Sequence, residues 1–232
     1  MSSSGDAPLL PGALQKCLRM VDHARSSSPR VAQLLRRIEA AGCELGAGGA
    51  PVVCEDVFGA ARVAGAYDHA RRAVVMNPRT PEAFLNQGEW TRAVAHELVH
   101  AFDSCRAAVD PRDCRHIACT EVRAANLSGD CDFGVELARV GPARMLGFAG
   151  GGGGGGGEGI PGLGGGAGMS SVGSGLGGHQ QRCVRRRAQL SLSMHPQCVE
   201  HAGAGAGDRR AARTVADVFD SCYNDFAPFA TN

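Results

Sequence analysis

Hydrophobic positions recur at helical spacing near the start of the chain and predict two helices there. The first helix opens at Pro11, and its apolar stripe consists of Leu14, Cys17, Leu18 and Val21. The second helix begins at Ser28, a good N-cap that precedes a proline at the first helical position, and it stops at Gly42. Both patterns are explained by ordinary packing.

Short runs rich in β-branched and aromatic residues follow and predict a small sheet. The runs are V-V-C-E-D-V (52–57), R-V-A-G-A-Y (62–67) and A-V-V-M-N (73–77), with a turn at 68–71. A hairpin at this place can hold an extended peptide as an extra strand along its edge, which is a recurring mode of peptide capture. A purely structural hairpin explains the same runs.

A longer helix is predicted from the cap residue Asn86 to about Arg106, and it contains H-E-L-V-H at 96–100. The positions around this motif are apolar, and no Gly or Pro interrupts them. His96 and His100 stand four residues apart, so they lie one above the other on the same helix face. Two histidines and a glutamate are costly to bury in an apolar helix, and one bound metal ion explains all three.

The spacing of the two histidines predicts a zinc site with a catalytic base beside it. Two imidazoles four residues apart can reach one Zn²⁺ at Zn–N distances of roughly 2.0–2.1 Å. Glu97 lies next to the open position of the metal, where it can take a proton from a water molecule, as the base of a metalloprotease does. We therefore predict His96 and His100 as metal ligands and Glu97 as the catalytic residue. A chance match of five residues, or ordinary core histidines, is the alternative.

A further helix is predicted over C-R-H-I-A-C-T-E-V-R-A-A-N-L (114–127), which ends at Ser128. Asp110 is a good N-cap for it, and Pro111 suits the first helical position. This helix carries Glu121, a candidate third metal ligand, although a surface glutamate on a solvated face explains the same residue.

Three residues compete for the role of third ligand: Asp103, His116 and Glu121. Asp103 stands seven residues from His96, about 10 Å along a straight helix, which is too far to close one coordination sphere. If this helix packs antiparallel to the one that carries the histidines, His116 lies slightly closer than Glu121 to the height of His100 along the helix axis. Two histidines and one glutamate form a common catalytic zinc set that leaves the fourth position for water, so we predict Glu121.

The composition of the chain indicates its redox environment and gives no sign of a nucleic-acid partner. The formal net charge of the 232 residues is +1, which gives no global attraction to nucleic acid. The ten cysteines are many and even in number, which favours an oxidising compartment and several disulfides over free thiols in a reducing one. No run of about 18 apolar residues predicts a membrane span, and the first residues do not resemble a cleaved targeting signal.

A glycine-rich segment, 149–178, interrupts the second half of the chain. It cannot bury enough apolar surface to offset the entropy of ordering it, so we predict a flexible insert. The chain is therefore expected to form a flexible tail at 1–10 and one domain made of residues 11–148 and 179–232.

Two helices are predicted after the insert, one through Val184 and Leu192 and the last from Arg209 to Tyr223. The first of them carries a basic cluster: Arg182, Arg185, Arg186 and Arg187. Such a cluster is usually a solvated face, but on a peripheral membrane protein it can contact anionic lipid at ~1 kcal/mol per residue.

Several longer motifs resemble one known family. They are H-E-L-V-H-A-F-D-S-C-R-A (96–107), R-H-I-A-C-T-E-V-R-A-A-N-L-S-G-D-C (115–131), Q-R-C-V-R-R-R-A-Q-L-S-L-S-M-H-P-Q-C (181–198) and V-F-D-S-C-Y-N-D-F-A-P-F (218–229). Together they resemble the mitochondrial inner-membrane metalloprotease family that assists F-type ATP synthase assembly. The resemblance covers roughly residues 10–140 and 180–230.

The resemblance implies a zinc peptidase of the mitochondrial intermembrane space, peripheral on the inner membrane. It also implies maturation of a mitochondrially encoded ATP synthase subunit and a role in assembling that enzyme. Oxidative folding in this space fits the many cysteines. We thus expect an α+β, zincin-like metalloprotease domain with a short sheet, the H-E-x-x-H helix and a mostly helical C-terminal half. An assembly chaperone that needs no proteolysis, or a merely structural metal-binding domain, remains an alternative.

Overall fold

The computed structural model describes residues 9–46, 49–58, 63–80, 86–145, 178–199 and 206–229. The predicted insert, 149–178, lies outside the described residues except for Gly178, and most of the predicted tail lies outside them as well. The remaining chain forms an α+β fold with one small sheet and mostly helical content, which confirms the predicted class.

Two helices form the N-terminal part: α1 (Ala13–Ser27) and α2 (Pro29–Ala40). The Ser28 side chain accepts a hydrogen bond from the Val31 N–H, which confirms the predicted N-cap. Both helices pack on α4 (Gln87–Arg106), because their buried apolar stripes share one core with it.

The sheet contains three strands, β1 (Val52–Cys54), β2 (Gly65–Asp68) and β3 (Ala73–Met76), in the order β1-β3-β2. β1 runs parallel to β3, and β2 pairs with β3 as an antiparallel hairpin. β2 is therefore an edge strand. The first predicted run was too long, because Glu55 and Asp56 leave the strand and pair with arginines.

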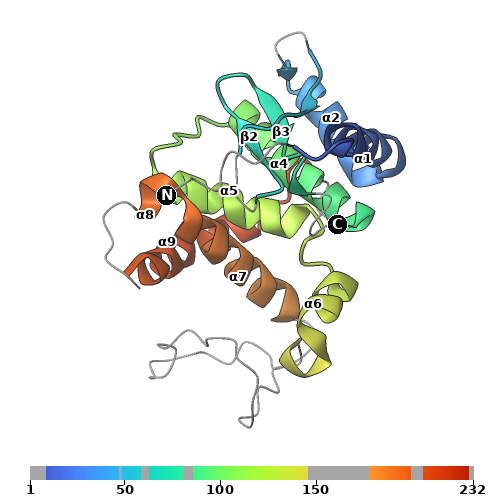
Figure 1. The fold of residues 1–232 in the computed structure, drawn as a ribbon. Coiled ribbons are helices and arrows are strands. Elements are labelled where there is room, and N and C mark those ends of the chain that lie inside the picture. The colour runs from blue at the N-terminus through green and yellow to red at the C-terminus, as the bar shows by residue number, and fades with distance from the viewer. Residues whose placement is uncertain are drawn as a thin grey trace, which may run out of the picture.

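In the described part of the second half the chain forms five helices: α5 (Cys114–Leu127), α6 (Phe133–Met145), α7 (His179–Met194), α8 (Pro196–Val199) and α9 (Ala206–Tyr223). α5, α7 and α9 bury their apolar faces against one another in a second core. α1, α2 and the sheet lie on one side of the molecule, and α7, α8 and α9 lie on the other (Figure 1). α4 and α5 pack together where the two cores meet.

All ten cysteines are paired, which confirms the prediction of several disulfides. Two pairs fasten the N-terminal part: Cys17–Cys54 and Cys43–Cys105. Three pairs connect α5 or the residue that closely follows it to the C-terminal helices: Cys114–Cys198, Cys119–Cys222 and Cys131–Cys183. Crosslinks that close long loops reduce the entropy of the unfolded chain, so these pairs add to the stability that the two apolar cores supply.

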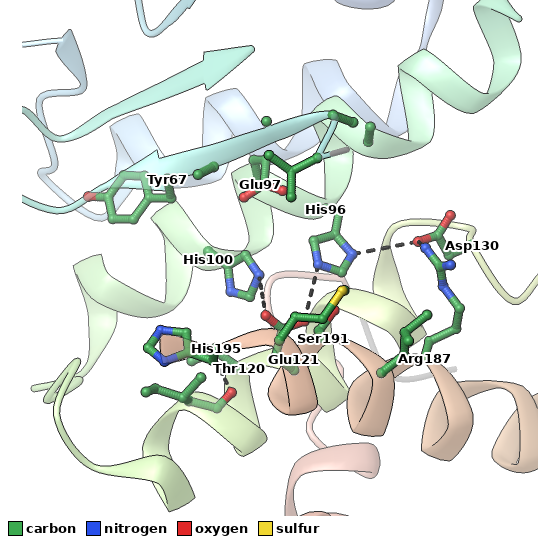
Figure 2. Close-up of a pocket in the computed structure, with 18 of the residues that line it drawn as sticks. Tyr67, His96, Glu97, His100, Thr120, Glu121, Asp130, Arg187, Ser191 and His195 are labelled. Atoms are coloured by element: carbon green, nitrogen blue, oxygen red, sulfur yellow. Dashed lines mark hydrogen bonds and ion pairs between the residues drawn. The ribbon is translucent and has the colours of Figure 1, made fainter. Parts of the chain in front are cut away.

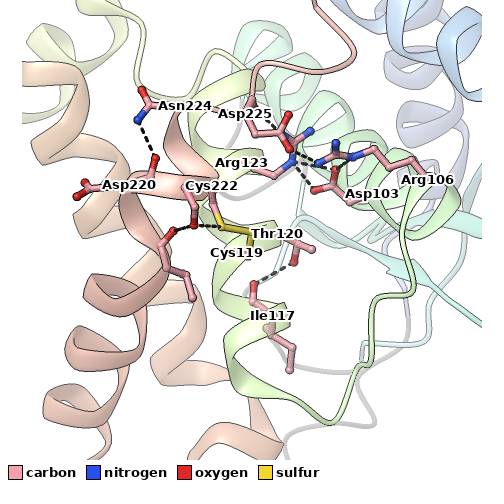
Figure 3. Close-up of a disulfide and its surroundings, with 12 residues drawn as sticks. Asp103, Arg106, Ile117, Cys119, Thr120, Arg123, Asp220, Cys222, Asn224 and Asp225 are labelled. Atoms are coloured by element: carbon pink, nitrogen blue, oxygen red, sulfur yellow. Dashed lines mark hydrogen bonds and ion pairs between the residues drawn. A yellow bond between two sulfur atoms is a disulfide. The ribbon is translucent and has the colours of Figure 1, made fainter.

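A buried ion-pair network joins α4, α5 and the C-terminal residues (Figure 3). Arg123 is 1% exposed, and its Nε lies 2.9 Å from both carboxylate oxygens of Asp103. The same guanidinium donates to the backbone carbonyls of Asp225 and Ala227 and pairs with the Asp225 carboxylate. A buried charge needs such partners, so this network fixes the lateral position of α5 on α4.

The predicted cap of α5 is wrong by three residues. Asp113 is the N-cap, and its carboxylate accepts a hydrogen bond from the Arg115 N–H at 2.8 Å. Asp110 instead forms a turn of its own, because its carboxylate accepts from the Arg112 N–H and its N–H donates to Nδ1 of His116.

Replacing the true cap should cost more stability than replacing the predicted one. We expect Asp113→Ala to lower the free energy of unfolding by about 1 kcal/mol, the usual effect of losing an N-cap side chain. Asp110→Ala should lower it by less. Denaturant unfolding of both variants with the disulfides intact measures the difference, and a larger loss in Asp110→Ala would contradict the assignment.

None of the helices in the described part of the chain is long and apolar enough to cross a membrane.

Candidate metal centre

α4 presents its polar residues to a cleft and its apolar residues to the core. The helix begins with a capping box, in which the Asn86 side chain accepts from the Glu89 N–H and the Glu89 carboxylate accepts from the Asn86 N–H. The face opposite the cleft is fully buried and consists of Trp90, Val94, Leu98 and Val99. The side chains of His96 and His100 are 13% and 14% exposed, so both reach the cleft from one helix face.

α5 adds Glu121 to the two histidines (Figure 2). Nε2 of His96 lies 3.4 Å from Oε2 of Glu121, and Nε2 of His100 lies 3.6 Å from Oε1. One ligand atom from each of the three residues lies within 4.8 Å of the others. The structure thus brings together the three residues that were predicted as metal ligands.

The two competing candidates lie elsewhere. Asp103 is 2% exposed and is occupied by Arg123 and Arg106. His116 is half exposed, accepts from the Asp110 N–H and lies 3.9 Å from the Asp113 carboxylate. Neither belongs to the cluster of possible ligands found among the described residues.

The separations between Glu121 and the two histidines are compatible with a shared zinc ion. Two ligand atoms at 2.0–2.1 Å from a tetrahedral zinc are about 3.3 Å apart, close to the 3.4 and 3.6 Å separations from Glu121 to the histidines. Oε2 of Glu121 is also buried without a hydrogen-bond partner in the described part of the chain. Such a buried acceptor needs a partner, and a cation between the three side chains supplies one.

Asp130 completes the surroundings of His96, and sequence reasoning missed it. Its Oδ2 lies 3.6 Å from Nδ1 of His96, while Arg187 and Arg139 hold the same carboxylate at 3.1 and 3.2 Å. Burial alone would raise the pKa of Asp130, but His96 and the arginines hold it well below its usual range. A carboxylate on the second ring nitrogen of a metal-binding histidine orients the ring and raises its basicity.

The surroundings of the cluster shift the pKa values of the two histidines in opposite directions. Burial acts to lower the pKa of His96, but the carboxylates of Asp130 and Glu121 outweigh it and raise the pKa to about 10. Burial lowers the pKa of His100 to about 4. Burial acts to raise the pKa of Glu121, but the nearby histidines lower it to about 2. In the metal-free protein at neutral pH, His96 therefore carries a proton while Glu121 is ionised.

Glu97 lies next to His96 on α4 and also faces the cleft. Burial raises its pKa to about 7, with the charge of His96 and the backbone N–H of Tyr67 acting in the opposite direction. A carboxylate that titrates near neutrality is suited to accept and return a proton, which is the task of a general base.

The predicted basic cluster is largely engaged within the domain. Arg187 pairs with Asp130, Arg186 pairs with Glu136 at 2.8 Å, and Arg185 lies 3.5 Å from Asp220. Lipid contact through these residues stays a prediction, but one of them already has a role beside His96.

An α+β domain with two histidines and a glutamate converging from adjacent helices is typical of a metallopeptidase. The profile of the Peptidase M76 family matches residues 15–147 and 168–230 of this chain. The chain therefore belongs to the Peptidase M76 family, which confirms both the family resemblance and the predicted class of enzyme, a metallopeptidase. The match leaves out 148–167, within the glycine-rich segment.

Similar proteins share one name. Mitochondrial inner membrane protease ATP23 homolog of Danio rerio is 35% identical over 92% of this chain and 66% of its own length. The Homo sapiens protein of that name is 34% identical over 93% and 69%, and mitochondrial inner membrane protease ATP23 of Mycosarcoma maydis is 39% identical over 59% and 45%. The chain thus spans about two thirds of the length of these vertebrate relatives. No solved structure matches it.

Proposed function

We propose that this chain is a zinc endopeptidase with a zincin-like active site, in which His96, His100 and Glu121 hold the metal and Glu97 is the base. The observation that carries this proposal is the convergence of the three ligand atoms within 4.8 Å of one another, beside a cleft that also contains Glu97. Zinc, when bound there, polarises the scissile carbonyl and makes a water molecule more acidic. Glu97 takes a proton from the attacking water and returns it to the leaving amine.

The cleft supports an extended peptide as the substrate. β2 lines it through Gly65, Ala66 and Tyr67, and β2 is one of the two edge strands of the sheet that the described residues form. An edge strand has unpaired backbone groups on one side, which can pair with a peptide backbone regardless of its sequence. The tertiary arrangement therefore favours an endopeptidase over a merely structural metal site.

We further propose that the chain acts at the mitochondrial inner membrane, on the side of the intermembrane space, where it matures a mitochondrially encoded ATP synthase subunit and assists ATP synthase assembly. The names of the relatives support the membrane and the protease activity. The disulfides support an oxidising compartment. Mass-spectrometric comparison of mitochondrial subunit N-termini, with and without this protein, tests the substrate. Unchanged N-termini would contradict it.

At pH 8.5 zinc binding should release about one proton from the ligand residues, in addition to the proton that the zinc-bound water loses. At that pH His96, whose pKa is raised to about 10, is protonated in the metal-free protein, whereas Glu97, His100 and Glu121 have already lost their protons. The proton on His96 should by itself make the zinc affinity rise about tenfold per pH unit until the pH approaches 10, because metal ligands must be deprotonated.

The folded protein without zinc has the opposite pH dependence. A raised histidine pKa contributes stability that is fully present below the unfolded value, about 6.5, and is lost as the pH rises toward 10.

Calorimetric zinc titrations in two buffers of different ionisation enthalpy count the protons that zinc binding releases. The Asp130→Asn protein should release fewer protons than the wild type. Equal proton release from the two proteins would contradict the conclusion that Asp130 raises the pKa of His96.

A further inference from the structure

The cleft over the metal ligands has two chemically different ends. It has a volume of about 890 Å³ and is lined by β2, α4, α5 and α7. The end beside His96 is ionic and contains Glu89, Asp130, Arg139 and Arg187. The apolar lining residues of α5, of α7 and of the segment that leads into α5 form what we call the apolar wall: Val109, Pro111, Ile117, Leu190 and Met194.

The apolar wall lies toward His100 because α5 and α7 run antiparallel. Cys114, the first residue of α5, is linked to Cys198 in α8, which follows α7, and Cys131 after α5 is linked to Cys183 near the start of α7. Between these crosslinks, Arg187 pairs with Asp130, and Ser191 lies beside Glu121 (Figure 2). The following residues of α7 therefore lie beside the first turns of α5. Figure 2 shows the same order, with Arg187 near His96 and His195 on the side of His100.

α7 turns an exposed apolar stripe into this cleft. Arg187, Leu190, Ser191 and Met194 follow the i, i+3, i+4, i+7 spacing of one helix face, and all four line the cleft. Leu190 is 50% exposed and Met194 is 61% exposed. Two large, neighbouring apolar side chains in an open cleft are an informative exception to the usual burial of such residues, and adjoining a candidate active site they indicate a ligand with an apolar group.

We propose that the apolar wall is a specificity subsite that binds a bulky aliphatic or aromatic side chain of the peptide substrate, at the first or second residue from the scissile bond. This subsite rests on the proposed peptidase function. Met194 lies three residues beyond Ser191, about 4.5 Å along α7. An extended peptide advances about 3.3 Å per residue, so a side chain opposite Met194 is one or two residues from the bond held at Glu121.

The carboxylate at the ionic end of the cleft is already paired within the protein. The Asp130 carboxylate is paired with Arg92, Arg139 and Arg187 as well as with His96, so it is not free to select a basic side chain. The apolar contact that we propose is made on the side of His100.

Cleavage specificity tests the subsite. Wild-type protein with zinc, given a peptide library from a digested proteome, should cut next to Leu, Ile, Met or Phe in preference to Gly or Asp. Leu190→Gln and Met194→Gln should lower kcat/KM for the apolar peptides roughly ten- to hundredfold, mainly through KM. Met194→Arg should shift the preference toward acidic side chains, which simple damage to the site would not do. Leu14→Gln, at a leucine of α1 that is 43% exposed, is the matched control and should change nothing.

Binding separates this inference from the proposed function. Zinc-loaded Glu97→Gln protein is titrated into fluorescein-labelled Gly/Ser peptides that carry one central Leu or one central Asp, and fluorescence anisotropy is recorded. The Leu peptide should bind at least about tenfold more tightly, and Met194→Gln in the same background should remove the difference. Equal affinities would overturn the subsite even if the wild-type protein hydrolyses peptides. A Leu preference without any hydrolysis by wild type would support the subsite and contradict the peptidase.

Discussion

Glu97→Gln protein should keep about one zinc ion per chain and lose peptide hydrolysis. The substitution preserves the size of the side chain and leaves His96, His100 and Glu121 in place, so the metal stays bound. It removes the only group we assign as proton acceptor, and general base catalysis contributes typically 10²–10⁴-fold to a rate. We therefore expect kcat on fluorogenic peptides to fall by at least about 10²-fold, with metal content measured on the same samples by mass spectrometry.

Glu39→Gln, the same chemical change at an exposed position of α2, is the control and should leave hydrolysis unchanged. Normal turnover by the Glu97→Gln protein would exclude Glu97 as the base. The same variant also separates the two proposed roles in cells. If it fails to process the subunit but still restores ATP synthase assembly, then the folded surface rather than hydrolysis is the main contribution.

Glu121→Ala protein should lose zinc. The substitution leaves two histidine ligands, and the charge that compensates the metal is gone. Changes in the outer shell of a metal site typically cost 10–100-fold in affinity, so loss of a direct ligand should weaken zinc binding by at least about 100-fold. A chelator competition assay measures this loss.

His116→Ala is the matched control, since His116 was the nearest competitor by position along the helices. It should retain full zinc and nearly full activity, because its ring contacts Asp110 and Asp113 rather than the cluster. Full zinc in Glu121→Ala together with loss in His116→Ala would overturn the assignment of the third ligand.

Part of this site is determined by the local sequence of one helix, and that part could be predicted. His96, Glu97 and His100 lie on one helix, whose cap and apolar face are both evident in the sequence, so their mutual placement follows from helix geometry. Glu121 could only be chosen by the chemistry of known zinc sets. Its place depends on how α5 packs on α4, and that packing is fixed by the buried contact of Asp103 with Arg123, a pair 20 residues apart.

The contacts that sequence reasoning missed are all tertiary. Asp130 follows the end of α5, where no periodicity applies, and it reaches His96 only because Arg139 and Arg187 arrive from α6 and α7. The cysteine count predicted crosslinks but not partners, since connectivity follows from the packing. At the start of α5, Asp110 and Asp113 both match the cap pattern, and the His116 ring decides between them by accepting from the backbone N–H of Asp110.

The crosslinks of α5 also make the candidate metal centre depend on the C-terminal end of the chain. All three ligand residues precede residue 122, but the bonds that fix α5 and the following loop reach forward over 52, 84 and 103 residues. Residues 96–121 therefore carry the proposed ligands, whereas the helices that position Glu121 and Asp130 lie far beyond them in the sequence. Reduction of these three disulfides should loosen the hold of the C-terminal helices on α5, so the candidate metal centre depends on the far end of the chain.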